Sequence, residues 1–345
     1  MERTADIELL SWRAGLPAQR GQMRARVFVA ALLTCALVSA GLASLVPLQF
    51  SIVTLFLFAG PHNWFELRYF LMRLPARFGK SRRFFVVAFA GIFALTLAYV
   101  ALPAFYYIGL WDGGNWESVT GVWNTVLVLW IATLITLRVK QNSRRSGGWV
   151  WPAAFALCAL NWLAPQAFSL GLVYLHPLVA LWFLDRHLRR TRPEWLKPYR
   201  RCLTVLPVLI FTICWLLAGT PALADDNGLA WRITQHAGTG ILPSVSSHLL
   251  VSLHVFLEML HYGVWLIALP LIGARGVPWD LKTIPLFRHP RGFPHTVTAV
   301  LIIGASLMFV LWFGFVVDYS ATRDIYFAVA MAHVLAEAPF LLRSI

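Results

Sequence analysis

The sequence predicts an all-α protein, a polytopic transmembrane bundle of about ten helices. Of its 345 residues, 59% are hydrophobic and only 13% are charged, which is the composition of a chain embedded in lipid. Apolar runs of about 20 residues, the length that crosses a hydrocarbon core of about 30 Å, recur along the sequence. Lys and Arg gather in alternate connections between these runs. Together these observations indicate an integral membrane protein.

Ten apolar segments account for the predicted helices in order. They lie at about 27–48, 50–68, 84–104, 119–138, 149–164, 166–186, 202–219, 248–272, 296–317 and 324–343. The fifth is short and is interrupted by Pro152, Asn161 and Pro165, so it either re-enters the membrane or forms one bent unit with the sixth. No long Gly/Ser linker divides the chain, so we expect a single transmembrane domain at 27–345 after an N-terminal segment at 1–26.

The basic residues predict the topology. If the N-terminus is inside, 27 of the 29 Lys and Arg residues fall in cytoplasmic segments, and only Arg232 and Arg323 lie outside. This distribution follows the positive-inside rule and places both termini in the cytoplasm. The net charge of +14 is therefore explained by topology and by attraction to anionic membrane lipids, and no nucleic-acid partner is expected. We expect a bacterial inner (plasma) membrane protein.

Histidines lie deep in the second, sixth, eighth and tenth predicted helices, all of which run from outside to inside. Counting 1.5 Å per residue from each outer end puts four of them at depths of about 14–19 Å and the fifth at about 9 Å. The four are His62, His176, His261 and His333, and the fifth is His254. Parallel helices bring equal depths together, so these side chains are predicted to share one layer as metal ligands.

Carboxylates accompany these histidines at helical spacing. Glu66 follows His62 by four residues, Glu337 follows His333 by four, and Glu258 lies between His254 and His261. Ionisable groups cost about 2.5–3.5 kcal/mol each near the bilayer centre, so they are retained where they find partners. A carboxylate can accept an N–H from a metal-bound imidazole on a neighbouring helix, so Glu66, Glu258 and Glu337 are predicted to orient ligands or take part in catalysis.

Three interpretations of the polar layer remain open. Many imidazoles with few carboxylates and no thiolate favour non-haem iron (Fe²⁺), although zinc and copper also accept nitrogen ligands. A pair of histidines on different helices could instead ligate haem. The third interpretation is a transporter or proton-conducting protein that uses a His/Glu relay, or polar side chains that only join helices. The other histidines, His236 among them, fall in predicted loops or near helix ends and are left out of the site.

The order of the histidine motifs resembles that of a known family. "PHNWFE", "LHPLVALWFLD", "HVFLEMLHYGVW" and "AHVLAE" occur in the same order as motifs of the Brp/Blh family of integral-membrane carotene-cleaving dioxygenases. The resemblance implies that His62, His176, His254 and His261 bind iron, with His333 as a fifth position by analogy. Two features depart from the family pattern: Asp185 lies further from His176 than the family's acid does, and His254 and His261 are seven residues apart rather than four.

The sequence therefore predicts a membrane-embedded oxygenase or other oxidoreductase that depends on a metal. Its substrate is expected to be lipophilic, such as a carotenoid or an acyl chain, with O₂ as the second reactant. Histidines would hold iron and leave positions open for O₂. The chain itself encodes no signal for its oligomeric state.

The topology can be tested with reporter fusions. A reporter placed after residue 225 should lie outside the membrane, and one placed after residue 345 should lie in the cytoplasm, because positive charge holds the connection at about 273–295 inside and three predicted helices separate the two positions. Reporter activity in the two compartments measures this. The ten-helix topology would be wrong if both fusions reported the same side.

Overall fold

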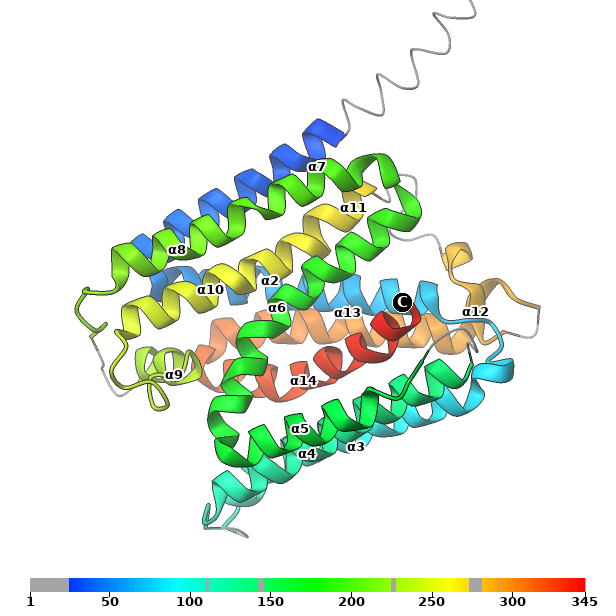
Figure 1. Cartoon of the computed structure of the whole chain (residues 1–345), viewed down its shortest axis with the longest axis horizontal. Helices are drawn as coiled ribbons and strands as arrows, with labels where there is room; N and C mark the ends of the chain where they lie inside the picture. The colour runs from blue at the N-terminus through cyan, green and yellow to red at the C-terminus, as the bar shows by residue number, and fades with distance from the viewer. Residues whose placement is uncertain are drawn as a thin grey trace, which may run out of the picture.

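A computed structural model describes residues 25–109, 112–141, 146–224, 228–272, 281–290 and 292–344. Within those ranges the chain is helical and contains no strand, which confirms the all-α class. Most of the predicted N-terminal segment at 1–26 lies outside the described residues. The helices run roughly along one direction and form a bundle (Figure 1).

The long helices match most of the predicted segments but extend further. The described helices are the N-terminal helix Ala25–Leu45, α2 Pro47–Arg73, α3 Arg82–Tyr107, α4 Trp116–Lys140, α5 Val150–Leu163, α6 Pro165–Thr191, α7 Pro193–Leu203, α8 Val205–Leu217, α9 Leu229–His236, α10 Ser247–Gly263, α11 Leu269–Ile272, α12 Pro285–Arg288, α13 Pro294–Val317 and α14 Tyr319–Ser344. A π-helical turn at Val264–Ala268 joins α10 to α11, and 3₁₀ turns lie at Gly79–Ser81 and Leu281–Thr283.

Eight helices in the described part of the chain are long and apolar enough to cross a membrane, which indicates an integral membrane protein. This number is smaller than the predicted ten for two reasons. The 14-residue α5 would span only about 21 Å, less than the hydrocarbon core. The 27-residue α2 is long enough, but His62, Glu66 and several other polar residues lower its hydropathy.

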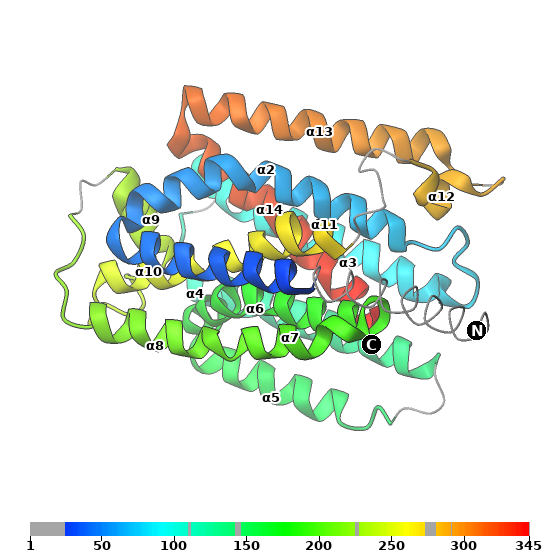
Figure 2. The same ribbon diagram turned by 90° about the horizontal axis from the view of Figure 1, so that it is seen from above.

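Four helices form a closed ring at the centre of the bundle. Helix α2 packs against α10 and α14, and α6 packs against the same two helices from the opposite side. The N-terminal helix, α7 and α8 share an apolar cluster with α6 and α10, whereas α3 and α4 pack with α2 and α14. Helix α13 covers α2 on an outer side of the bundle (Figure 2). The ring is therefore enclosed by apolar helices.

Small residues allow α13 to approach α2 closely. A Cβ at Gly60 would lie 2.5 Å from the Cγ of Met308, and one at Gly304 would lie 2.9 Å from Cδ2 of Leu67. Both distances are too short for an ordinary contact. Glycine at these two positions therefore fixes the outer wall of the ring against α2.

Amide side chains join α4, α5 and α6. The Nδ2 of Asn124 donates to Oδ1 of Asn161 at 2.8 Å and to Oγ of Ser169 at 3.0 Å. The Nδ2 of Asn161 donates in turn to the carbonyl oxygen of Gly121 at 2.8 Å. Both asparagines are fully buried, and their hydrogen bonds hold the short helix α5 against the bundle.

Replacing Asn161 by alanine should destabilise this contact. The substitution leaves the Gly121 carbonyl and part of the Asn124 amide without their partner, at a cost of about 1–2 kcal/mol. Thermal unfolding in detergent measures the loss as a lower midpoint. Leu160→Ala is the control because its side chain is on the same helix and 56% exposed. Equal shifts in the two variants would contradict the role of the amide network.

Candidate metal centre

Four of the five predicted histidines converge inside the helix ring. His62 lies on α2, His176 on α6, His261 on α10 and His333 on α14. The imidazole centroid of His62 lies 5.4 Å from that of His261 and 5.2 Å from that of His333. The centroid of His176 lies 4.6 Å from that of His261. Each helix of the ring thus contributes one imidazole to the same layer, as the depth argument predicted.

The ligand atoms of these residues form two overlapping groups that could hold a metal ion. One group joins His62, His261 and His333 with Glu66, and the other joins His176 and His261 with Glu337. Within each group the ligand atoms all lie within 4.8 Å of one another. His62, Glu66, His261 and Glu337 are at most 5% exposed. His261 belongs to both groups and is the centre of the arrangement.

Polar contacts orient two of the imidazoles. Nδ1 of His62 lies 3.0 Å from the carbonyl oxygen of Phe58, and a carbonyl only accepts, so Nδ1 carries the proton. Nε2 of a neutral His62 then has a free lone pair. Nδ1 of His176 lies 3.3 Å from Oε2 of Glu337. This contact lets the carboxylate orient His176 in the way the sequence predicted for an acid on a neighbouring helix.

Many polar atoms at this site are buried without a hydrogen-bond partner. They are Nε2 of His62, both ring nitrogens of His261, Nδ1 of His333, both carboxylate oxygens of Glu66 and Oε1 of Glu337. A buried polar group without a partner costs about 1–3 kcal/mol, and more if it is charged. Nearly all of these atoms are electron-pair donors that a cation would satisfy. The donor set therefore fits a metal ion.

Irregular backbone accompanies the site on each helix of the ring. Pro61 precedes His62 in α2, Pro177 follows His176 in α6, and Pro339 lies two residues after Glu337 in α14. Helix α10 has no such proline, but the π-helical turn begins three residues after His261. Proline removes a backbone hydrogen bond, and π-helical turns occur often at functional sites. These interruptions were not part of the sequence prediction.

The structure places His254 apart from the other four histidines, which corrects its predicted position. Its ring lies 5.1 Å from that of His236 and 5.8 Å from that of Tyr174, and it belongs to neither ligand group. The seven residues between His254 and His261 correspond to about 10.5 Å along the helix, which exceeds the reach of a shared ion.

His236 was expected in an external loop and was left out of the site. It is the last residue of α9, and it lies beside His254 of α10. Burial, together with the neighbouring His254 and Arg323, holds the pKa of His236 well below its usual range. Its imidazole is therefore neutral at pH 7. His236 and His254 form a separate aromatic pair, with the ring of Phe327 stacked 4.2 Å from that of His236.

Glu258 lies near the candidate centre but outside both ligand groups. The hydroxyl of Tyr262 donates to Oε1 of Glu258 at 2.6 Å, and the Tyr262 ring lies 4.4 Å from the ring of His62. Tyr262 therefore lies between Glu258 and His62. Sequence reasoning missed Tyr262, although its place directly after His261 was visible in "HYGVW".

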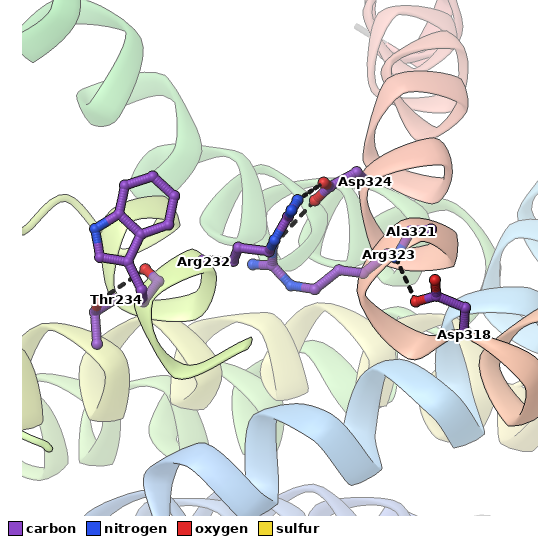
Figure 3. A network of polar contacts seen from close by, with 7 residues as sticks. Arg232, Thr234, Asp318, Ala321, Arg323 and Asp324 are labelled. Atoms are coloured by element: carbon purple, nitrogen blue, oxygen red, sulfur yellow. Dashed lines mark hydrogen bonds and ion pairs between the residues drawn. The ribbon is translucent and has the colours of Figure 1, made fainter. Parts of the chain in front are cut away.

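Charged residues connect α9 to the start of α14. Figure 3 shows Arg232 of α9 paired with Asp324 of α14, while Arg323 of α14 lies 3.8 Å from the Asp324 carboxylate. The Oδ1 of Asp318 accepts from the backbone N–H of Ala321 at 2.9 Å and caps α14. Arg232 and Arg323 were the two basic residues predicted outside. Both belong to an ion-pair network that holds α9 over one end of the ring.

No protein-family model, no curated protein and no solved structure matches this chain. The site must therefore be judged on its own geometry.

Metal content should separate the converging histidines from His254. We expect His62→Ala and His261→Ala to lose bound metal, because each removes a ligand and leaves an ion weakly held. His254→Ala should keep it, since this side chain lies with His236 and Tyr174. Elemental analysis of purified protein gives the metal-to-protein ratio. His289→Ala, directly after α12, controls for handling, and size-exclusion profiles control for folding.

A loss of metal in His254→Ala as large as that in His261→Ala would contradict this grouping. So would an unchanged ratio in all four variants.

Proposed function

We propose that this protein is a membrane-embedded, metal-dependent oxygenase that acts on a lipophilic substrate. The observation that carries the proposal is the layer of buried imidazole nitrogens and carboxylate oxygens without partners. In a region without water such atoms are costly to keep, so an arrangement of this kind is retained for a purpose. A cation bound by one of the two ligand groups would satisfy several of these atoms at once.

Non-haem iron is the ion that we propose. His62, His261 and His333 with Glu66 would hold it, and His176 with Glu337 would lie alongside. Nitrogen ligands combined with one carboxylate suit Fe²⁺, and no cysteine belongs to either group among the described residues. The carboxylates of Glu66 and Glu337 would balance the charge of a divalent ion in this low-dielectric layer.

When bound, ferrous iron supplies an open coordination position and one-electron chemistry for O₂. The protein's own residues position the ligands. The Phe58 carbonyl keeps Nδ1 of His62 protonated so that Nε2 faces the site, and Glu337 keeps His176 in place. Tyr262 covers His62 on one side, and its hydroxyl is held by Glu258. These contacts limit the movement of the ligands and exclude water.

The apolar surroundings support a lipophilic substrate such as a polyene or an acyl chain. Helices around the ring expose large hydrophobic side chains outward, so the protein would share the apolar phase in which a lipophilic substrate dissolves. The motif order that resembles the Brp/Blh family supports a carotenoid in particular, with cleavage by O₂ as the reaction. We propose a bacterial plasma membrane as its location.

The geometry supports iron without haem. Each of the four imidazoles has at least two others with centroids between 4.6 and 6.3 Å away. A porphyrin placed between any two of them would collide with the remaining imidazoles, so a haem pair does not fit this packing.

A proton relay is the second candidate, because Glu258, Tyr262 and His62 follow one another in contact. A relay would require these groups to be wet and to titrate. The partnerless nitrogens of His261 argue for an ion instead.

Metal analysis combined with an absorption spectrum and oxygen consumption tests the proposal. Purified protein should contain iron, lack a Soret band and consume O₂ when supplied with a carotenoid or an unsaturated acyl lipid in detergent. Glu66→Gln should keep the shape of the side chain and lower iron affinity or turnover by at least about 10-fold. His289→Ala should behave as the unmodified protein.

If the purified protein carries no metal and moves protons across vesicle membranes in response to a pH gradient, the proton relay is the correct function and the oxygenase proposal is wrong. A Soret band would replace it by a haem protein.

A further inference from the structure

A small cavity adjoins the candidate metal centre. Its walls come from α2, α6 and α14 of the helix ring and from the π-helical turn that follows α10. The lining residues are Phe70, Phe183, Trp265, Glu337, Phe340 and Leu341. The cavity volume is about 10 Å³, which is close to the minimum that holds one water-sized molecule.

Stacked aromatic rings give the cavity rigid walls. Phe70 and Phe340 stack with centroids 4.3 Å apart and an interplanar angle of 5°, and Phe183 and Trp265 stack at 5.6 Å and 20°. All four side chains are at most 8% exposed. Side chains packed in this way cannot easily move into the space, so the cavity persists.

The surface of the cavity is entirely apolar. A buried water needs two to four polar partners, and apolar cavities stay dry and take up apolar molecules such as xenon. Glu337 forms part of the wall, but its polar oxygens are not exposed there: Oε2 lies against His176, and Oε1 is buried. Water is therefore a poor occupant of this cavity.

We propose that this cavity is a binding site for one small apolar molecule, and that dioxygen occupies it beside the metal centre. A single side chain, Glu337, belongs both to the cavity wall and to the ligand group of His176 and His261. A molecule in the cavity would thus be separated from the centre by one carboxylate. The identity of the occupant as O₂ rests on the proposed oxygenase function, whereas the affinity for small apolar molecules does not.

Xenon tests the cavity independently of any metal, because it is a single apolar atom that binds in dry apolar cavities. Crystals of the metal-free protein under xenon pressure should show an anomalous peak between Trp265 and Phe340. Leu341→Phe fills the cavity and should abolish the peak, whereas Leu341→Ala enlarges it and should raise the occupancy. The two variants act in opposite directions, so misfolding of one still leaves a test.

Leu203→Phe is the matched control. It adds the same aromatic group at a different small cavity, which lies between the N-terminal helix, α7 and α10. The peak beside Trp265 should remain in this variant. Absence of the peak from the unmodified protein, or its persistence in Leu341→Phe, would overturn the proposal.

Oxygen kinetics of the iron-loaded protein then test the identity of the occupant. Leu341→Phe should raise the KM for O₂ severalfold and leave the KM for the lipophilic substrate and the iron content unchanged. An unchanged KM for O₂ together with the loss of xenon would overturn the assignment to dioxygen. If the protein consumes no O₂ at all, the proposed function fails, while the xenon peak still decides whether the cavity binds small apolar molecules.

Discussion

The organisation of this protein depends on the cost of keeping polar atoms in a layer without water. Two buried polar clusters differ in whether their polar atoms have hydrogen-bond partners. The amides of Asn124 and Asn161 satisfy each other and nearby backbone groups, so this cluster closes a helix contact. The cluster around His261 leaves its nitrogens and several carboxylate oxygens without partners. Buried polar groups are almost always satisfied in stable folds, so the second cluster marks a place where a metal ion could bind.

The arrangement of the helices follows from this requirement. One imidazole from each of four helices can meet only if those helices form a ring, and the ring must then be covered by helices that face lipid. Helix α2 contributes both His62 and Glu66, and the close approach of α13 at Gly60 covers its outer side. The polar residues that make α2 part of the site are also those that lower its hydropathy below that of its neighbours.

The helical class and the shared layer of four histidines could be predicted because apolar length and rise per residue are local properties of the sequence. The position of His254 could not, since spacing on one helix does not show which neighbour lies opposite. The ring of His254 contacts that of His236, which lies in a connection of about 30 residues between two long helices. This connection has no hydrophobic periodicity from which its path could be predicted. Tyr262 was hidden for a similar reason: an aromatic residue beside a histidine is ordinary until its ring is found against His62.

The interruptions in the ring helices have a mechanical consequence. Pro61, Pro177 and Pro339 cannot donate to the carbonyl one turn earlier, and the π-helical turn after His261 widens the backbone of the fourth helix. Each of the four ring helices thus has irregular backbone hydrogen bonding close to the histidine layer, while the rest of each helix keeps regular hydrogen bonds. A bundle built in this way bends most easily at the level of its histidines. Bending there would separate helices around the centre without unpacking their ends.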